Sequence, residues 1–171
     1  MRLLSSAILP VVASLVLLAM NCGVPSTSQG ASTEISQTAD SEQLKSIRAK
    51  VFSHVLASEF DAAIPLYEKA IRLARAEGKP ELSIQFMNNL AGCYHLKYSY
   101  RDAVSHYRQA LKDATRLGLK QQQTLATLNL AALFLVSGES DGARELISRL
   151  SLNRENFVAS TRLDSYLQLV N

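Results

Sequence analysis

The chain has 171 residues, a length that suits one folded domain with short extra segments and excludes a second large domain. It has no tryptophan, four prolines and 47% hydrophobic residues, with abundant alanine, leucine, serine and glutamine, which favours helices over strands. The formal net charge of +3 falls by one when Arg2 is set aside, too little for the strongly basic face of a nucleic-acid-binding protein. We therefore expect an all-α protein without a nucleic-acid partner.

Residues 1–22 have the three parts of a secretory signal peptide. Arg2 is followed by an uncharged, largely apolar run over 3–20, and then by Asn21, Cys22 and Gly23. This pattern predicts export. An uncleaved membrane anchor is the alternative, because the apolar run reaches the length of about 17 to 25 residues that a spanning helix needs.

The position of Cys22 resembles the lipidation site of bacterial lipoproteins. In that family the cysteine follows the apolar run and becomes the lipid-modified first residue of the mature chain. Leucine usually stands three places before it and glycine or alanine directly before it, whereas this chain has Ala19 and Asn21. The resemblance implies a lipid on Cys22 and a membrane-anchored protein on the periplasmic or extracellular side of a bacterial envelope.

The segment 23–40 has the composition of a flexible linker. Serine, threonine, glutamine, glycine and alanine dominate it, and its few apolar residues follow no helical period. Such a linker would hold the folded part near the membrane at a root-mean-square distance of roughly 25 Å.

Apolar residues three and four places apart predict seven helices after the linker. Asp40 with Gln43 is interpreted as the capping box of the first helix, and Gly78, Gly118 and Gly138 end three later ones. The predicted helices cover about 40–58, 61–77, 80–97, 101–117, 120–136, 141–150 and 154–170. The last has an apolar stripe without the repeat described next, and we expect it to be a capping helix within 151–171.

A period of forty residues relates these helices. A shift of forty places aligns Ala63 with Ala103 and Ala143, and it aligns the run 89–91 with the identical run 129–131. A period of this size is typical of stacked helical pairs. It predicts an α-solenoid of about three pairs over 41–150.

The middle pair resembles the tetratricopeptide repeat. In this family the first helix carries leucine, a small residue and a tyrosine three places later, and the second carries alanine, an aromatic residue and a second alanine. All six are present, as Leu90, Ala91, Tyr94, Ala103, Tyr107 and Ala110. The third pair has Ile147 and Leu150 at the last two positions, and the first has Val51 and His54 at two of its own. The commonest form repeats every 34 residues or so, about six fewer than here.

The resemblance implies a right-handed solenoid whose first helices line a concave groove for an extended peptide or a subunit of another protein. The candidate groove residues are Arg48, Asn88, Asn89, His95 and Asn129, with Lys45 and Phe52 beside Arg48. A recurring asparagine can donate and accept hydrogen bonds toward a peptide backbone. Alternatively, Asn89 and Asn129 bond to neighbouring helices and hold the stack in register. We expect a non-catalytic adaptor or assembly factor, or else a constitutive structural subunit of a membrane-associated complex.

Catalytic and metal-binding patterns are not found in the sequence. His54, His95 and His106 fall on different helical faces, without acidic or cysteine residues at metal-ligand spacing. Cys93 lies in an apolar helix without an activating base, so we expect a buried, inert thiol. We therefore expect no catalytic residues, no metal, no cofactor and no small-molecule substrate.

A row of basic residues marks the outer face of the second helices. It consists of Arg101, Arg108, Lys112 and Arg116, with Arg72 one repeat earlier. It is interpreted as a solvated face or as a contact for anionic headgroups.

Overall fold

A computed structural model describes residues 41–151 as six α-helices packed in chain order. They are α2 (Glu42–Leu56), α3 (Phe60–Ala76), α4 (Pro80–Leu96), α5 (Tyr100–Arg116), α6 (Lys120–Ser137) and α7 (Ser140–Ser151). Each lies within two residues of its predicted bounds, the usual uncertainty of a helix end. The predicted signal over 1–22, the linker over 23–40 and the capping helix at about 154–170 lie outside the described residues.

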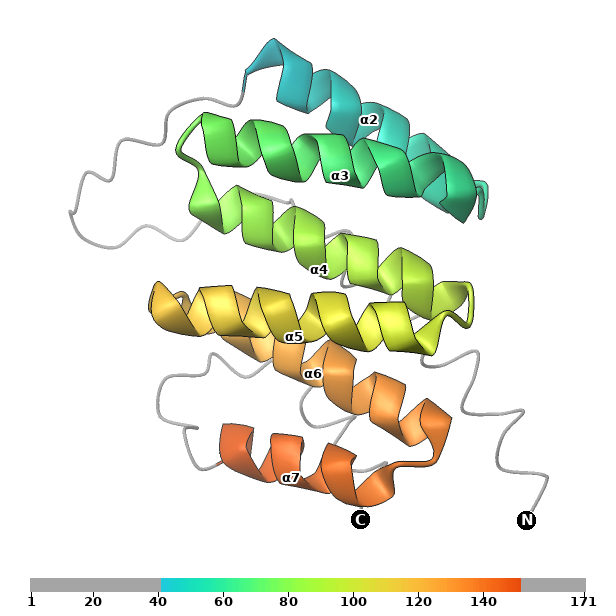
Figure 1. Ribbon diagram of the computed structural model, residues 1–171, viewed down its shortest axis with the longest axis vertical. Coiled ribbons are helices and arrows are strands. Elements are labelled where there is room, and N and C mark those ends of the chain that lie inside the picture. Colours follow the sequence, from blue (N-terminus) through green and yellow to red (C-terminus); the bar gives the residue numbers. More distant parts are fainter. Residues whose placement is uncertain (1–40, 152–171) are drawn as a thin grey trace, which may run out of the picture.

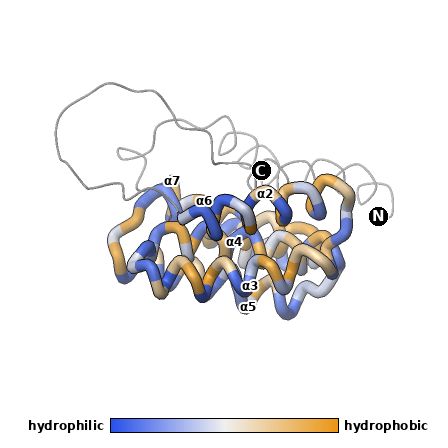
Figure 2. The backbone as a smooth tube through the Cα atoms, turned by 90° about the horizontal axis from the view of Figure 1, so that it is seen from above, coloured by the Kyte–Doolittle hydropathy of each residue, from blue (hydrophilic) through white to orange (hydrophobic). Residues whose placement is uncertain are grey.

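The six helices form antiparallel pairs, α2 with α3, α4 with α5 and α6 with α7, and each pair packs on the next (Figure 1). From above, α2, α4 and α6 lie along one side of the stack and α3 and α5 along the other (Figure 2). We call these sides the first layer and the second layer. The arrangement confirms the predicted all-α fold of stacked helix pairs.

The connections between helices repeat as regularly as the helices do. The residue at each connection has a positive φ: Ser58 (58°), Gly78 (67°), Tyr98 (61°), Gly118 (68°) and Gly138 (85°). The amide after each one donates to a carbonyl five residues back, as Glu59 does to His54 at 2.8 Å. This is the Schellman cap, whose left-handed residue closes a helix end. From α3 onward a new helix therefore starts every twenty residues, and two such helices make the forty-residue period.

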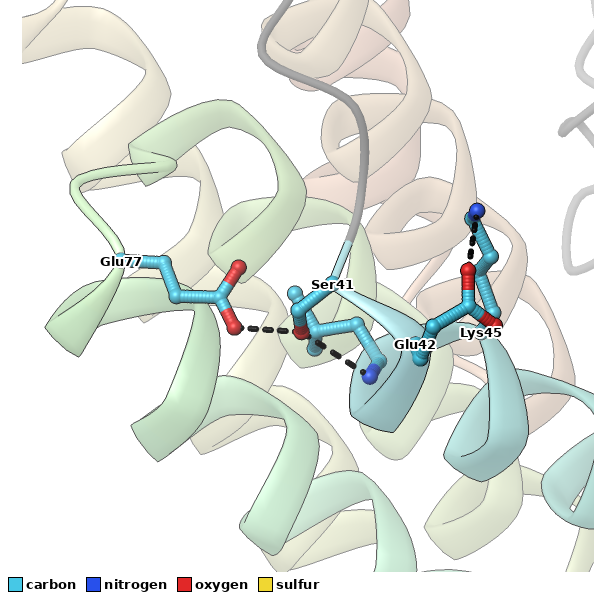
Figure 3. Close-up of polar contacts among 5 residues, drawn as sticks. Ser41, Glu42, Lys45 and Glu77 are labelled. Atoms are coloured by element: carbon cyan, nitrogen blue, oxygen red, sulfur yellow. Dashed lines mark hydrogen bonds and ion pairs between the residues drawn. The ribbon is translucent and has the colours of Figure 1, made fainter.

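The N-cap of α2 is Ser41, one residue after the predicted cap at Asp40. The Ser41 hydroxyl accepts from the Leu44 amide at 3.2 Å and donates to the Glu77 carboxylate at 2.5 Å (Figure 3). Lys45 and Glu42 form an ion pair at 2.8 Å beside it. The hydrogen bond from Ser41, more than the nearby Lys79, lowers the pKa of the Glu77 carboxyl. The serine thus caps α2 and ties it to the end of α3.

The alanines and tyrosines that recur every forty residues lie at the contacts between helices. Ala63, Ala103 and Ala143 are completely buried, so neighbouring helices approach closely at these positions. Tyr67 and Tyr107 are 4% and 0% exposed and fill the space between pairs. Burying an aromatic side chain of this kind contributes about 2 to 3 kcal/mol.

Candidate functional site

Polar side chains join α4 and α6, the two neighbouring helices of the first layer, at two points. The Asn129 amide donates to the Asn88 carbonyl oxygen at 3.3 Å, and the Gln122 amide donates to the Glu81 carboxylate at 2.6 Å. The two bonds lie seven residues, or two helical turns, apart on both helices. Asn88 and Asn129 are only 6% and 4% exposed. A buried amide pair is favourable only while both partners stay aligned, so these bonds hold α4 and α6 in register.

Asn89 is half-buried and reaches a different helix from its neighbour Asn88. Its side chain is hydrogen-bonded to Tyr67 of α3. Burial raises the pKa of Tyr67, a smaller effect of Cys93 adds to the rise, and the bond to Asn89 opposes it. Asn89 therefore links the first layer to the second.

Arg48 lies on the exposed surface of α2. Its guanidinium carbon is 5.8 Å from the centre of the Phe86 ring on α4, within the range of a cation–π contact. Of the five predicted groove residues, Arg48 is the only one with an exposed side chain. This side of α2 therefore faces α4, its neighbour in the first layer.

His95 lies in the core between α4 and α5 and is 5% exposed. Its ring meets the rings of Tyr100 and Tyr107 edge-on, with centroids 6.0 and 6.4 Å away. Its Nδ1 atom has no hydrogen-bond partner within the described part of the chain. Burial lowers the pKa of His95 to about 4, so the ring is neutral near neutral pH.

The structure thus brings two of the five predicted groove residues, Asn88 and Asn129, into contact with each other. Arg48, Asn89 and His95 lie against three other partners, on α4, α3 and α5. Partner binding by any of the five stays a prediction.

Two exposed apolar residues lie on α2 near Arg48: Phe52, which was predicted beside it, and Leu56, which was not. Phe52 is 47% and Leu56 is 66% exposed, and both follow Arg48 on α2 at intervals of four residues. Residues four apart share one face of a helix, so the three form a stripe, which we call the α2 stripe. The buried face of α2, with Leu44, Ile47, Val51 and Val55, adjoins this stripe. Leu56 was missed although its spacing of four residues from Phe52 was visible in the sequence.

Cys93 is completely buried in α4. Burial raises the pKa of the Cys93 thiol to about 12, against a smaller lowering by Lys97, so the thiol is protonated at neutral pH. Over residues 41–151, no three His, Cys, Asp or Glu side chains gather closely enough to share a metal ion.

None of the six described helices combines the length and the apolar character needed to cross a bilayer. No protein-family model, curated protein or solved structure matches the chain. The described residues form an all-helical domain of six sequentially packed helices, consistent with a helical repeat.

Proposed function

We propose that this chain is a non-catalytic, tetratricopeptide-like repeat protein that binds a peptide segment or subunit of another protein. The observation that carries the proposal is the α2 stripe, where Phe52 and Leu56 expose large apolar side chains one turn apart. Single exposed apolar residues are common on soluble proteins, but contiguous ones with a charged neighbour are typical of interaction surfaces. Arg48 supplies that charge, and arginine is frequent among residues that dominate binding energy.

The α2 stripe is suited to an extended or helical segment that carries an apolar side chain and a carboxylate. The apolar side chain would cover Phe52 and Leu56, while the carboxylate would pair with Arg48. The Arg48 guanidinium is already held over the Phe86 ring, which lowers the entropy lost when it pairs.

Crosslinking in cells tests this function. We expect a photoreactive phenylalanine analogue at position 52 to trap one partner protein, because that side chain is exposed on α2. With the photoreactive analogue at the exposed position 49 of α2 instead, the double variant Phe52→Ala with Leu56→Ala should trap about tenfold less of that partner than the chain with Phe52 and Leu56 intact. Mass spectrometry of the crosslinked product measures both results.

The matched control is Tyr98→Ala with Leu117→Ala, which removes two exposed apolar residues away from the α2 stripe. It should leave the crosslinking yield unchanged. Equal trapping from Glu145, an exposed residue of α7, would instead indicate a structural subunit surrounded by other proteins. That outcome would support a constitutive structural subunit and contradict the adaptor function.

We further propose that the domain works at a bacterial envelope, exported and held at the membrane by a lipid on Cys22. The apolar run before this cysteine and the serine-rich segment after it support this location. Replacing Cys22 with serine should move the protein from the membrane fraction to the soluble fraction, whereas Ser26→Ala should leave it in the membrane. Unchanged fractionation of the Cys22 variant, with an intact N-terminus in the mass spectrum, would point to an uncleaved anchor over 3–20.

A further inference from the structure

A recess of about 520 Å³ lies on α5 of the second layer, beside the end of α6. Its lining includes the apolar side chains of Val104 and Leu133 and the ring of Tyr100. Three basic residues of α5, Arg101, Arg108 and Lys112, also line it. The recess is formed by other residues than those of the α2 stripe, so its function can be tested independently.

The three cations of the recess have no acidic partner within the described part of the chain. No carboxylate of residues 41–151 lies within ion-pair distance of Arg101, Arg108 or Lys112, although Arg116, one turn further on, pairs with Asp113 at 3.9 Å. All three are exposed. The guanidinium carbon of Arg108 is 5.9 Å from the centre of the Phe134 ring, a contact that holds this cation beside the recess.

One carboxylate, that of Glu139, also lines the recess, and it accepts a hydrogen bond from Ser137 at 3.2 Å. Three positive charges and one negative charge leave the recess with a net positive charge. An anionic ligand is therefore favoured, and Glu139 should weaken its binding.

The spacing of these residues along α5 limits the shape of the ligand. With a rise of about 1.5 Å per residue, Val104, Arg108 and Lys112 lie about 4.5, 10.5 and 16.5 Å from Arg101 along the helix axis. In an extended peptide, alternate side chains face the same way and are about 6.8 Å apart. Three such side chains reach Arg101, then Val104, and then the interval between Arg108 and Lys112.

We propose that this recess binds an extended segment of a partner protein with the pattern acidic, any, apolar, any, acidic. The two carboxylates pair with the cations of α5, and the apolar side chain between them covers the partly buried Val104. The pattern occurs in neither segment 1–40 nor segment 152–171 of this chain, so the ligand belongs to another protein.

Fluorescence anisotropy with the full-length chain tests the proposal. The probe is a labelled peptide of glycine and serine that carries glutamate, leucine and glutamate at alternate positions. We expect saturable binding that weakens as salt is added. Changing both glutamates to glutamine should weaken it about tenfold, because the ion pairs with the cations of α5 are lost. Equal binding of the glutamine peptide would overturn the proposal.

Matched variants locate the site on the protein. The triple variant Arg101→Gln, Arg108→Gln and Lys112→Gln should weaken binding about tenfold, as expected for three surface ion pairs. Arg72→Gln, Arg75→Gln and Arg116→Gln remove the same charge from exposed positions outside the recess and should change affinity less than about twofold. Glu139→Gln should tighten binding. Equal losses in the two triple variants, or weaker binding by the Glu139 variant, would contradict the proposal.

Vesicles distinguish the peptide from an anionic membrane surface. Vesicles of phosphatidylcholine, and of equal parts phosphatidylcholine and phosphatidylglycerol, are added to the peptide complex. We expect neither to displace the peptide. Displacement by the anionic vesicles alone would assign the recess to a membrane and overturn the peptide proposal.

Discussion

Replacing Asn129 with leucine lowers the free energy of unfolding by about 1 to 3 kcal/mol, because Asn88 is then left buried without its hydrogen-bond partner. Leucine is close to asparagine in size, so the loss reflects the polar group. In the double variant, Asn88→Leu with Asn129→Leu, neither amide remains to be satisfied. We therefore expect the double variant to lose less stability than the two single variants added together. Urea unfolding of the four proteins measures this difference.

Gln121→Leu is the matched control for the asparagine pair, since Gln121 is an exposed amide on the same helix, α6. It should change stability by less than about 0.5 kcal/mol. Additive losses in the single and double variants would show that Asn88 and Asn129 do not depend on each other. The register function that we derive from their contact would then be wrong.

We expect His95 to lower the free energy of unfolding by about 2 kcal/mol between pH 7 and pH 5. The pKa of His95 in the folded chain is about 4, below the value of about 6.5 expected when the chain unfolds. Between these values the unfolded chain binds a proton that the folded chain does not. The contribution is therefore fully present above pH 6.5 and is lost as the pH falls toward 4.

His95→Phe keeps a ring between Tyr100 and Tyr107 but cannot bind a proton. Between the two pH values its free energy of unfolding should therefore change by about 2 kcal/mol less than that of the wild type. Unfolding by urea at each pH measures the difference. His106→Phe is the comparison, because His106 is partly buried beside Tyr94 and its pKa is lowered by burial, against opposing effects of Asp102 and Glu68. It should remove a smaller part of the pH dependence. An equal pH dependence in wild type and His95→Phe would contradict the assigned pKa.

The helices were predictable because each one is specified by local patterns. Apolar spacing located all six described helices, and glycines at 78, 118 and 138 indicated three of the five connections. Ser58 and Tyr98 adopt the same left-handed backbone as these glycines, and their residue types gave no signal for it. That all five connections share one type of cap therefore became visible only in the structure.

The candidate site was less predictable, because the direction of a side chain depends on its neighbours from other helices. The repeat alignment pairs Asn89 with Asn129, yet the asparagine that bonds to Asn129 is Asn88. One residue along a helix is a rotation of about 100°, enough to send Asn89 to Tyr67 in the second layer instead. The basic row on α5 was visible in the sequence, but its position around a recess was not.

By itself, the sequence determined the all-α class and the number of described helices, because helix periodicity and caps involve residues close together in the chain. The forty-residue repeat indicated their arrangement in pairs. Only the tertiary structure decided which polar side chains are buried, which cations line a recess and which apolar residues of α2 stay exposed. These properties depend on helices twenty to forty residues apart in the chain. Packing brings them together, and the sequence pattern of one helix does not contain that information.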